Sequence, residues 1–456
     1  MKKTTSSANT PMIQKIVRRI AFDIGSGMTK MELADELYYN VMDDDTNNQI
    51  KMEKHIVTMD PMIAQRVVGL KGDLQDSNTK EFTVQIENKL SNALSELLLT
   101  AVNYESPIDG VDNVPDENFY ITSCGIATQA FRESLNGENV MKKLRSKFNS
   151  TLEIIPQAEE ARIGFLATIA TVNNNNIDDE DNGDIYKNSV LFDQGGGSMQ
   201  ICCVQEDYQI PIQQPITYEG SLGFYKLIAA FAKIKEIDVN PTTIASSQDS
   251  SGFYPITSKE YMSFSNWVDK ELQKDGIESG DNVVASIQNR FKNNENVRCL
   301  GIAGVFLIFP TITNNNVITL KELDEAIEKR INRTYDEILN ENPILLNTSN
   351  DNSAITTPSS DRSKKDSSKQ HLEQEQEEQE LVPRFVPWQF VVPLIYVSRL
   401  FHFFGIEKIE LVKSTLTRGL LEEVDNKLYW PDDNNNLLMR KDEMLKLLQS
   451  AKQSSY

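Results

Sequence analysis

The chain has 456 residues, enough for two or more domains with cores of their own. Its 67 acidic side chains outnumber 46 lysines and arginines, and the formal net charge of -21 argues against a general surface for nucleic acid or an anionic membrane. The 3 histidines and 4 cysteines show no metal or redox spacing, and no apolar run reaches the roughly 20 residues that span a bilayer. We therefore expect a cytoplasmic protein with reduced cysteines.

The first predicted strand, 16–22, follows a polar tail at 1–15 and ends at Asp23. Gly25, Ser26 and Gly27 then form a turn before a second apolar strand, which predicts a hairpin. Glycine lets backbone N–H groups approach a ligand closely, so such a turn can bind phosphate oxygens. An aspartate at the strand end can hold a hydrated cation beside that phosphate.

Apolar residues recur at helical spacing over 82–102, which predicts a helix that packs on the first sheet. A strand at 119–128 then runs into a helix that carries Thr128 and Arg132 near its start. The first N–H groups of a helix have no hydrogen-bond partner within it, so together with the Arg132 guanidinium they could bind an anion there. Taken alone, Arg132 could equally be an ordinary surface ion-pair partner.

A basic amphipathic helix at 140–148 and a strand at 152–155 lead to an apolar helix through 170, which opens with Glu159 and Glu160. Adjacent glutamates in a first helical turn usually lie at the surface, where they complement the helix dipole. Their place just before the next glycine-rich turn favours a catalytic role instead.

A second hairpin is predicted at 189–204, where Asp193 ends an apolar strand and Gly195, Gly196, Gly197 and Ser198 form the turn. One such hairpin could be no more than a tight glycine turn with a capping aspartate. Because the same pattern occurs at Asp23, the two hairpins indicate a duplicated core with a cleft between its halves.

The remaining elements complete the domain hypothesis. We expect an N-terminal domain at 16–170, an acidic, asparagine-rich insertion at 171–188, and a second domain at 189–346 and 382–430. Within the second domain we predict a strand at 297–303, a helix at 320–339, a core helix that starts after the prolines of 382–404, and a strand at 409–412 that turns into a helix. The low-complexity segment 347–381 is expected to be disordered, and 431–456 to be a tail with one helix.

The ordered motifs resemble those of the exopolyphosphatase/guanosine pentaphosphate phosphohydrolase (Ppx/GppA) family of the actin-like, sugar kinase and Hsp70 ATPase superfamily. The resemblance covers roughly 20–424. Its most specific part is Glu-Glu-Ala-Arg at 159–162 shortly before Asp-x-Gly-Gly-Gly-Ser at 193–198. The motifs that carry it further are Asp-Ile-Gly-Ser at 23–26, Ala-Thr-Gln-Ala-Phe-Arg at 127–132, Leu-Gly at 222–223 and Thr-Arg-Gly-Leu-Leu at 417–421.

The resemblance implies an α/β fold with two actin-like (ribonuclease H-like) domains around a central cleft, without the C-terminal His-Asp domain of longer members. It implies a Mg²⁺-dependent hydrolase that releases terminal phosphate from inorganic polyphosphate or guanosine pentaphosphate. Glu160 and Asp193 match catalytic positions, and Asp23 and Asp193 match positions that act on the metal. The residues that match phosphate-contacting positions are Gly25, Ser26, Thr128, Arg132, Gly195, Gly196, Gly197 and Ser198.

The expected partner is therefore polyphosphate or a nucleotide polyphosphate, with no nucleic acid and no membrane, and a homodimer is left open. Two alternatives also stay open. The first turn continues Gly-Ser-Gly-Met-Thr-Lys at 25–30, closer to the actin style than to the family's Ser-Asn-Ser, which keeps an actin- or Hsp70-like ATPase under consideration. The acidity and this departure also allow a non-catalytic regulatory protein that binds phosphorylated metabolites or nucleotides.

Overall fold

The structure is a computed structural model. It describes residues 13–43, 49–58, 64–106, 108, 111, 114–175, 182–204, 215–237, 254–293, 296–302, 306, 315–334, 337, 388–423, 426–430 and 437–453. The low-complexity segment 347–381 lies outside the described residues, as does most of the predicted N-terminal tail. None of the described helices is both long and apolar enough to cross a membrane.

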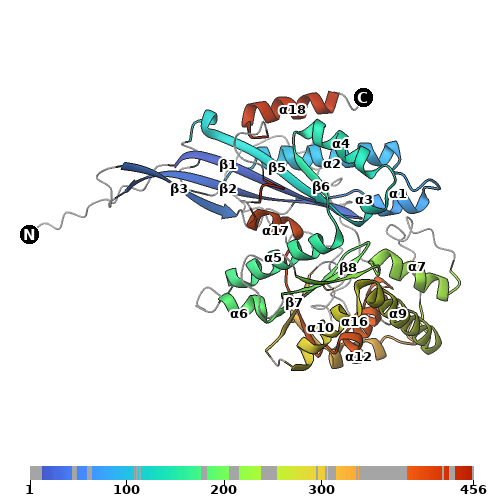
Figure 1. Ribbon diagram of the computed structural model, residues 1–456. Coiled ribbons are helices and arrows are strands. Elements are labelled where there is room, and N and C mark those ends of the chain that lie inside the picture. Colours follow the sequence, from blue (N-terminus) through green and yellow to red (C-terminus); the bar gives the residue numbers. More distant parts are fainter. Residues whose placement is uncertain are drawn as a thin grey trace, which may run out of the picture.

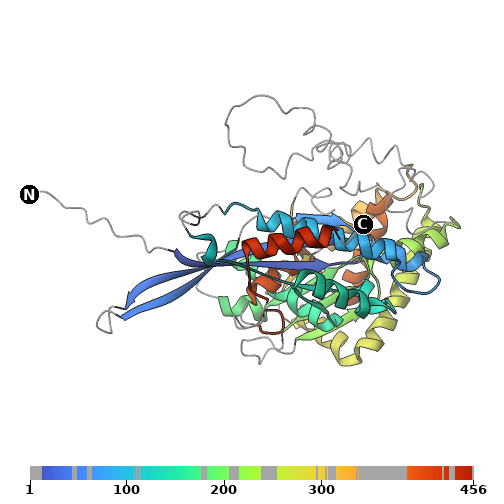
Figure 2. The same cartoon turned by 90° about the horizontal axis from the view of Figure 1, so that it is seen from above.

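The first domain is built on a 7-stranded sheet in which neighbouring strands follow the order β13-β5-β1-β2-β3, with β4 on β2 and β6 on β5. β1 runs antiparallel to β2 and parallel to β5. The hairpin predicted around the first glycine turn is therefore present, and β2 and β3 extend well beyond the body of the domain (Figures 1 and 2). The strands are β1 (Ile13–Ile24), β2 (Met28–Asp43), β3 (Gln49–Thr58), β4 (Ala64–Val67), β5 (Phe119–Ala127), β6 (Thr151–Ile154) and β13 (Met439–Arg440).

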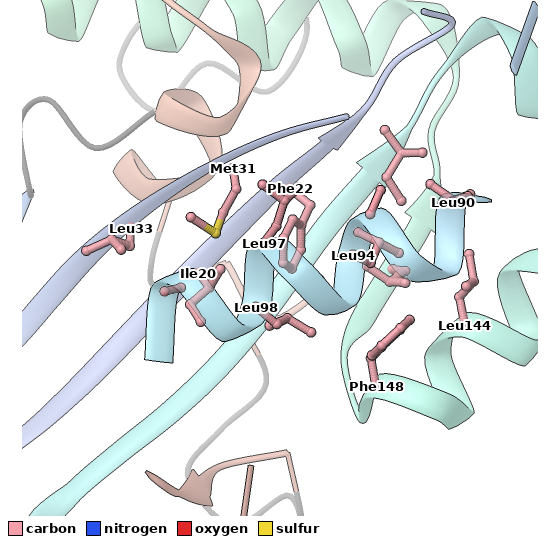
Figure 3. Close-up of a cluster of buried hydrophobic side chains, with 14 of the residues drawn as sticks. Ile20, Phe22, Met31, Leu33, Leu90, Leu94, Leu97, Leu98, Leu144 and Phe148 are labelled. Carbon is pink, nitrogen blue, oxygen red and sulfur yellow. The ribbon is translucent and has the colours of Figure 1, made fainter. Parts of the chain in front are cut away.

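Helices cover one face of this sheet. Helix α2 follows the predicted periodicity, and its buried residues Leu90, Leu94, Leu97 and Leu98 face apolar side chains of β1 and β2 (Figure 3). Leu144 and Phe148 of α4 join the same core (Figure 3). The elements on this side are α1 (Leu70–Asp76), α2 (Val84–Val102), the short 3₁₀ helix η2 (Asp116–Asn118), α3 (Gln129–Glu133), α4 (Gly137–Phe148) and α18 (Lys441–Gln453).

The second domain contains a 6-stranded sheet in the order β11-β12-β10-β7-β8-β9. β7 runs antiparallel to β8, as the second predicted hairpin requires, and parallel to β10. Cys202 and Cys203 of β8 lie in different hydrophobic clusters, because neighbouring strand residues point to opposite faces. The strands are β7 (Ser189–Gln194), β8 (Met199–Cys203), β9 (Ile216–Gly220), β10 (Arg298–Ile302), β11 (Val317–Thr319) and β12 (Lys408–Leu411).

The helices of the second domain are α6 (Asn182–Lys187), α7 (Phe224–Ile234), α9 (Ser258–Ser279), α10 (Asp281–Asn293), α12 (Leu320–Glu328) and α16 (Trp388–Phe404). Two of them differ from prediction. The helix expected over 320–339 ends at Glu328, and Asn332 beyond it takes a left-handed φ of 63° that breaks the helical path. Helix α16 begins at Trp388 and includes Pro393 inside it, instead of starting after this proline, so the helix lacks the hydrogen bond that an N–H at position 393 would donate.

Helices α5 (Gln157–Asn175) and α17 (Leu416–Glu422) lie between the two sheets (Figure 1). Phe165 and Ile169 of α5 pack with β7, β8 and β10 of the second sheet. Leu420 and Leu421 of α17 pack with β1 and β5 of the first. The expected boundaries had assigned each helix to the other domain. Apolar residues occur all around α5, so its pattern does not single out the sheet on which it packs.

The C-terminal segment returns to the first domain instead of forming a separate tail. β13 pairs with β5, and Met444, Leu448 and Ala451 of α18 lie in the same core as α2. The second domain is thus inserted between two parts of the first. The predicted α/β class is confirmed: two domains, each built on a mixed sheet covered by helices.

Candidate active site

The two glycine turns have the same backbone structure. In the turn between β1 and β2, the Gly25 N–H donates to the carbonyl of Met28 at 3.0 Å. In the turn between β7 and β8, the Gly195 N–H donates to the carbonyl of Ser198 at 2.9 Å. The same bond therefore closes two turns of equal length, and the duplication predicted from the sequence is present in the structure.

The strand register is also repeated. Asp23 lies opposite Lys30, and Asp193 lies opposite Gln200. Directly opposed residues share one face of a sheet, so each aspartate has a long polar side chain beside it. The two halves match in position but differ in charge, because the first offers a cation and the second a neutral amide.

Both turns direct carbonyl groups toward the start of a helix. The carbonyl of Ser26 accepts the N–H of Lys71 in α1 at 2.9 Å, and that of Gly195 accepts the N–H of Phe224 in α7 at 3.1 Å. Within the described part of the chain, the turn N–H groups that donate no hydrogen bond are those of Ser26, Gly27, Gly196, Gly197 and Ser198. These groups are the donors that phosphoryl oxygens could use.

The turns lie in direct contact across the two domains. A Cβ at Gly197 would lie 2.8 Å from Ser26 Oγ and 2.7 Å from Gln129 Cγ, closer than real Cβ atoms come. A Cβ at Gly196 would lie 3.0 Å from Cε2 of Tyr225, which follows the second turn. Glycine at 197 is thus needed for the close approach of the domains.

Three carboxyl groups gather beside the turns. Asp23, Glu160 and Asp193 are each at most 6% exposed, and they come from β1, α5 and β7. A Cβ at Gly164, one turn further along α5 than Glu160, would lie 3.5 Å from Asp193 Oδ2. The structure therefore brings together the three acids that the sequence singled out from distant segments.

Burial is the largest influence on the protonation of these acids. It raises the pKa of Glu160 to about 7, although the Arg132 guanidinium lowers it; the charge of Asp23 adds to the rise. Burial also raises the pKa of Asp193 well above its usual value, and the charge of Glu160 raises it further. Burial raises the pKa of Asp23 as well, against the opposing effect of Lys30. A cation at this site would favour the ionised forms.

Arg132 of α3 contacts Glu160 directly. Its Nη1 lies 2.8 Å from Glu160 Oε2 and also donates to the carbonyl of Ile155 at 2.9 Å. Nη2 donates to Gln129 Oε1 at 2.8 Å. The predicted phosphate-binding arginine thus holds the candidate catalytic carboxyl, and its remaining N–H donors are left for an anion.

The two adjacent glutamates differ sharply in environment. Glu159 accepts hydrogen bonds from Arg162 at 2.7 Å and from the Tyr429 hydroxyl at 2.6 Å. Burial alone would raise the pKa of Glu159, but these bonds lower it. Arg162 in turn pairs with Glu423 beyond α17. Glu159 and Arg162 therefore tie α5 to the segment after α17, and only Glu160 joins the other two acids.

Thr128 and Ser198 are both buried beside the turns. The N–H of Thr128 donates to the carbonyl of Ile24 at 3.4 Å, which places it next to the first turn. Ser198 Oγ accepts from Gln200 Nε2 at 2.8 Å, so its side chain is directed along β8. Both lie where the sequence placed them, whereas their contact with phosphate stays a prediction.

Sequence reasoning missed two charged residues of β2. Lys30 acts on Asp23, Asp193 and Glu32, each of whose pKa values it lowers against the effect of burial. Glu32 is buried and accepts a hydrogen bond from the Thr415 hydroxyl at 2.8 Å. A usable signal was the alternation of charged and apolar residues over 30–33, which places Lys30 and Glu32 on one face of the strand.

The described residues contain no group of three or more His, Cys, Asp or Glu side chains arranged to hold a metal ion. Asp23 and Asp193 nevertheless suit a hydrated Mg²⁺, which commonly takes one or two carboxylates and keeps several waters. Neither carboxyl group takes part in a hydrogen bond to another described residue, so their oxygens are uncommitted.

The repeated hairpins, the two mixed sheets and the pair of central helices define a protein with a two-domain, actin-like fold. Residues 122–216 match the profile of the Ppx/GppA phosphatase family. This segment contains Thr128, Arg132, Glu160, Asp193 and the second turn, but not the first turn. No curated protein sequence matches the chain.

Solved structures of a Ppx/GppA family member and of an exopolyphosphatase-like protein share the fold. The Aquifex aeolicus member of the Ppx/GppA family is 12% identical, covers 90% of this chain and 99% of its own, and gives a TM-score of 0.51. An exopolyphosphatase-like protein is 14% identical, with coverage of 90% and 98% and a TM-score of 0.51. The resemblance to the Ppx/GppA family predicted from the motifs is therefore confirmed, and the chain has the two-domain fold of that family.

Proposed function

We propose that this protein is a phosphoanhydride hydrolase that releases terminal phosphate from inorganic polyphosphate or guanosine pentaphosphate. The observation that carries the proposal is Glu160, a buried carboxyl group with a pKa of about 7 that is held by Arg132 next to two phosphate-sized turns. A general base works best when its pKa lies near the working pH.

The proposed roles follow from the positions of the side chains. Phosphoryl transfer depends mostly on positioning and charge neutralisation. The N–H groups of the two turns and the hydroxyl of Ser26 would bind phosphoryl oxygens, and Lys30 would add positive charge. Glu160 would take a proton from the attacking water while Arg132 keeps its carboxyl group in place.

Asp23 and Asp193 would hold Mg²⁺ through its water shell. A bound Mg²⁺ neutralises charge on the phosphoryl oxygens and orients the transferred group. The two aspartates would also carry full negative charge in its presence, since a divalent cation opposes the rise in pKa that burial causes.

The net negative charge of the chain favours short substrates over long polyphosphate. A net charge of -21 repels a long polyanion, so chains of a few phosphates or a nucleotide polyphosphate are expected to bind better than long polyphosphate. The proposal places the protein in the cytoplasm without a nucleic-acid or membrane partner. All 4 cysteines are free and buried, as suits a reducing compartment.

The test compares Glu160→Gln with Glu159→Gln in a phosphate-release assay with Mg²⁺. The substrates are tripolyphosphate, long polyphosphate, guanosine pentaphosphate and ATP. Glu160→Gln removes the general base and is expected to lower kcat at least about 100-fold. Glu159→Gln should retain activity, because Glu159 contacts Arg162 and Tyr429 and not the other two acids. Release at the wild-type rate by Glu160→Gln would refute the proposal, and hydrolysis of ATP alone would indicate an actin-like ATPase.

A second candidate is a regulatory protein that binds phosphorylated ligands without turnover. The direct contact between Gly197 and Ser26 favours it, because a ligand that enters between the turns must separate them and change the angle between the domains. Tight binding of guanosine pentaphosphate without any phosphate release would support this function over hydrolysis.

A further inference from the structure

A chain of polar side chains runs from the surface of the first domain to Glu160. Lys71 of α1 pairs with Glu133, and Glu133 accepts a hydrogen bond from the side-chain amide of Gln129. The oxygen of that amide accepts from Arg132 at 2.8 Å, and Arg132 donates to Glu160 at 2.8 Å. Each side chain in this series touches the next.

Gln129 occupies the one position in this series that needs a neutral amide. Arg132 has only donors and Glu133, when ionised, has only acceptors. A residue between them must therefore accept on one side and donate on the other. A glutamine side chain does both, and its two hydrogen bonds orient the amide in a single way.

The stem of Gln129 also meets the second domain. Its Cβ and Cγ are the atoms that a Cβ at Gly197 would strike, at 2.8 Å and 2.7 Å. The second glycine turn therefore contacts α3 through the side chain of Gln129. A shift of that turn displaces the residue that orients Arg132.

We propose that Gln129 is a positioning residue that holds Arg132 against Glu160 and links this pair to the position of the second glycine turn. The inference rests on the role of Glu160 in the proposed function. It goes further, because it assigns to one residue the task of coupling closure of the two domains to the orientation of the base.

The informative variants are Gln129→Met and the exchange Gln129→Glu with Glu133→Gln. Methionine keeps a stem of similar length against Gly197 but removes both hydrogen bonds. In the double variant, the carboxylate at position 129 accepts from Arg132, and the amide at position 133 donates to that carboxylate. The carboxylate and the amide have thus changed places. Melting temperatures of both variants serve as the check that the fold is retained.

Two readouts are needed. The first is solvent exchange of the Arg132 guanidinium protons by NMR, with the signal assigned by its loss in Arg132→Lys. The second is kcat and KM for phosphate release. In Gln129→Met, exchange is expected to be about tenfold faster and kcat about tenfold lower with little change in KM, as for other residues that orient a reacting group through a neighbour. The exchanged pair should restore both values.

A wild-type rate of guanidinium proton exchange together with a wild-type kcat in Gln129→Met would overturn the inference. So would a folded double variant, Gln129→Glu with Glu133→Gln, that restores neither the proton-exchange rate nor kcat. Its failure is separable from that of the proposed function. If Glu160→Gln releases phosphate as well as wild type does, the function is wrong, and the guanidinium exchange still decides whether Gln129 positions Arg132.

Discussion

Glu160 is poised between its two protonation states near neutral pH, because burial outweighs the nearby guanidinium. As a general base it must be ionised, so kcat is expected to rise about tenfold per pH unit on the acidic side and to level off at or below pH of about 7, because bound Mg²⁺ favours the ionised form. In Arg132→Gln the counter-charge is lost, which should move this rise to higher pH. Rate profiles between about pH 5 and about pH 9 check both points, and a flat wild-type profile would contradict them.

The same residue links stability to pH. The pKa of Glu160 is about 7 in the folded chain and 4.5 ordinarily, so the folded state holds this proton more tightly. The protonated Glu160 side chain contributes fully to the free energy of unfolding below pH of about 4.5. This contribution is lost as pH rises to about 7, and the full loss is about 3 kcal/mol. We expect the free energy of unfolding to fall less over this range in Glu160→Gln than in wild type. Denaturant titrations without Mg²⁺ at both ends of the range test this difference.

Single residues differed in how far their roles could be predicted. Asp23, Asp193 and Glu160 were identifiable because each belongs to a motif with its own local spacing. Gln129 lies within the motif at 127–132, but that motif indicated roles only for Thr128 and Arg132, and Glu32 belongs to none of the motifs. Their significance arises from contacts with Gly197 and Thr415, which are far away in the sequence and meet only after the domains assemble.

Among the elements, the crossing of α5 and α17 depends on a glycine. A Cβ at Gly419 would strike the backbone carbonyl of Ile163, which cannot move as a side chain can. Gly419→Ala is therefore expected to destabilise the protein by about 1–3 kcal/mol in chemical denaturation. Gly195→Ala is the matched control for stability, since a Cβ there would meet only the Ser198 carbonyl at 3.4 Å. Equal stability of the two variants would contradict the prediction.

Helices and strands were predictable wherever they are specified by residues close together in the sequence. The helical period of 82–102 and the two glycine hairpins carry their structure within a few residues, and all three appear as expected. The sheet on which α5 packs was not predictable, because this helix is apolar on several sides and serves both domains. Ile163 lies in the cluster with α17 and Phe165 in the cluster with the second sheet.

At the scale of the whole molecule, the first domain is completed by the end of the described chain. Leu448 of α18 is 3% exposed and belongs to the core formed by α2 and β1. Leu448→Ala is expected to lower the free energy of unfolding by about 2–5 kcal/mol. Lys446→Ala, two residues away with its side chain in solvent, should change it by less than about 0.5 kcal/mol. A small effect of Leu448→Ala would mean that α18 is not part of this core.

The insertion of one domain into the other has a mechanical consequence. The chain passes between the domains twice, from β6 to α5 and from β12 to α17, and both passages adjoin the place where α5 and α17 cross. Two covalent links at one edge leave the domains free chiefly to rotate about the line that joins them. A distance measured between labels on the two glycine turns would follow this rotation.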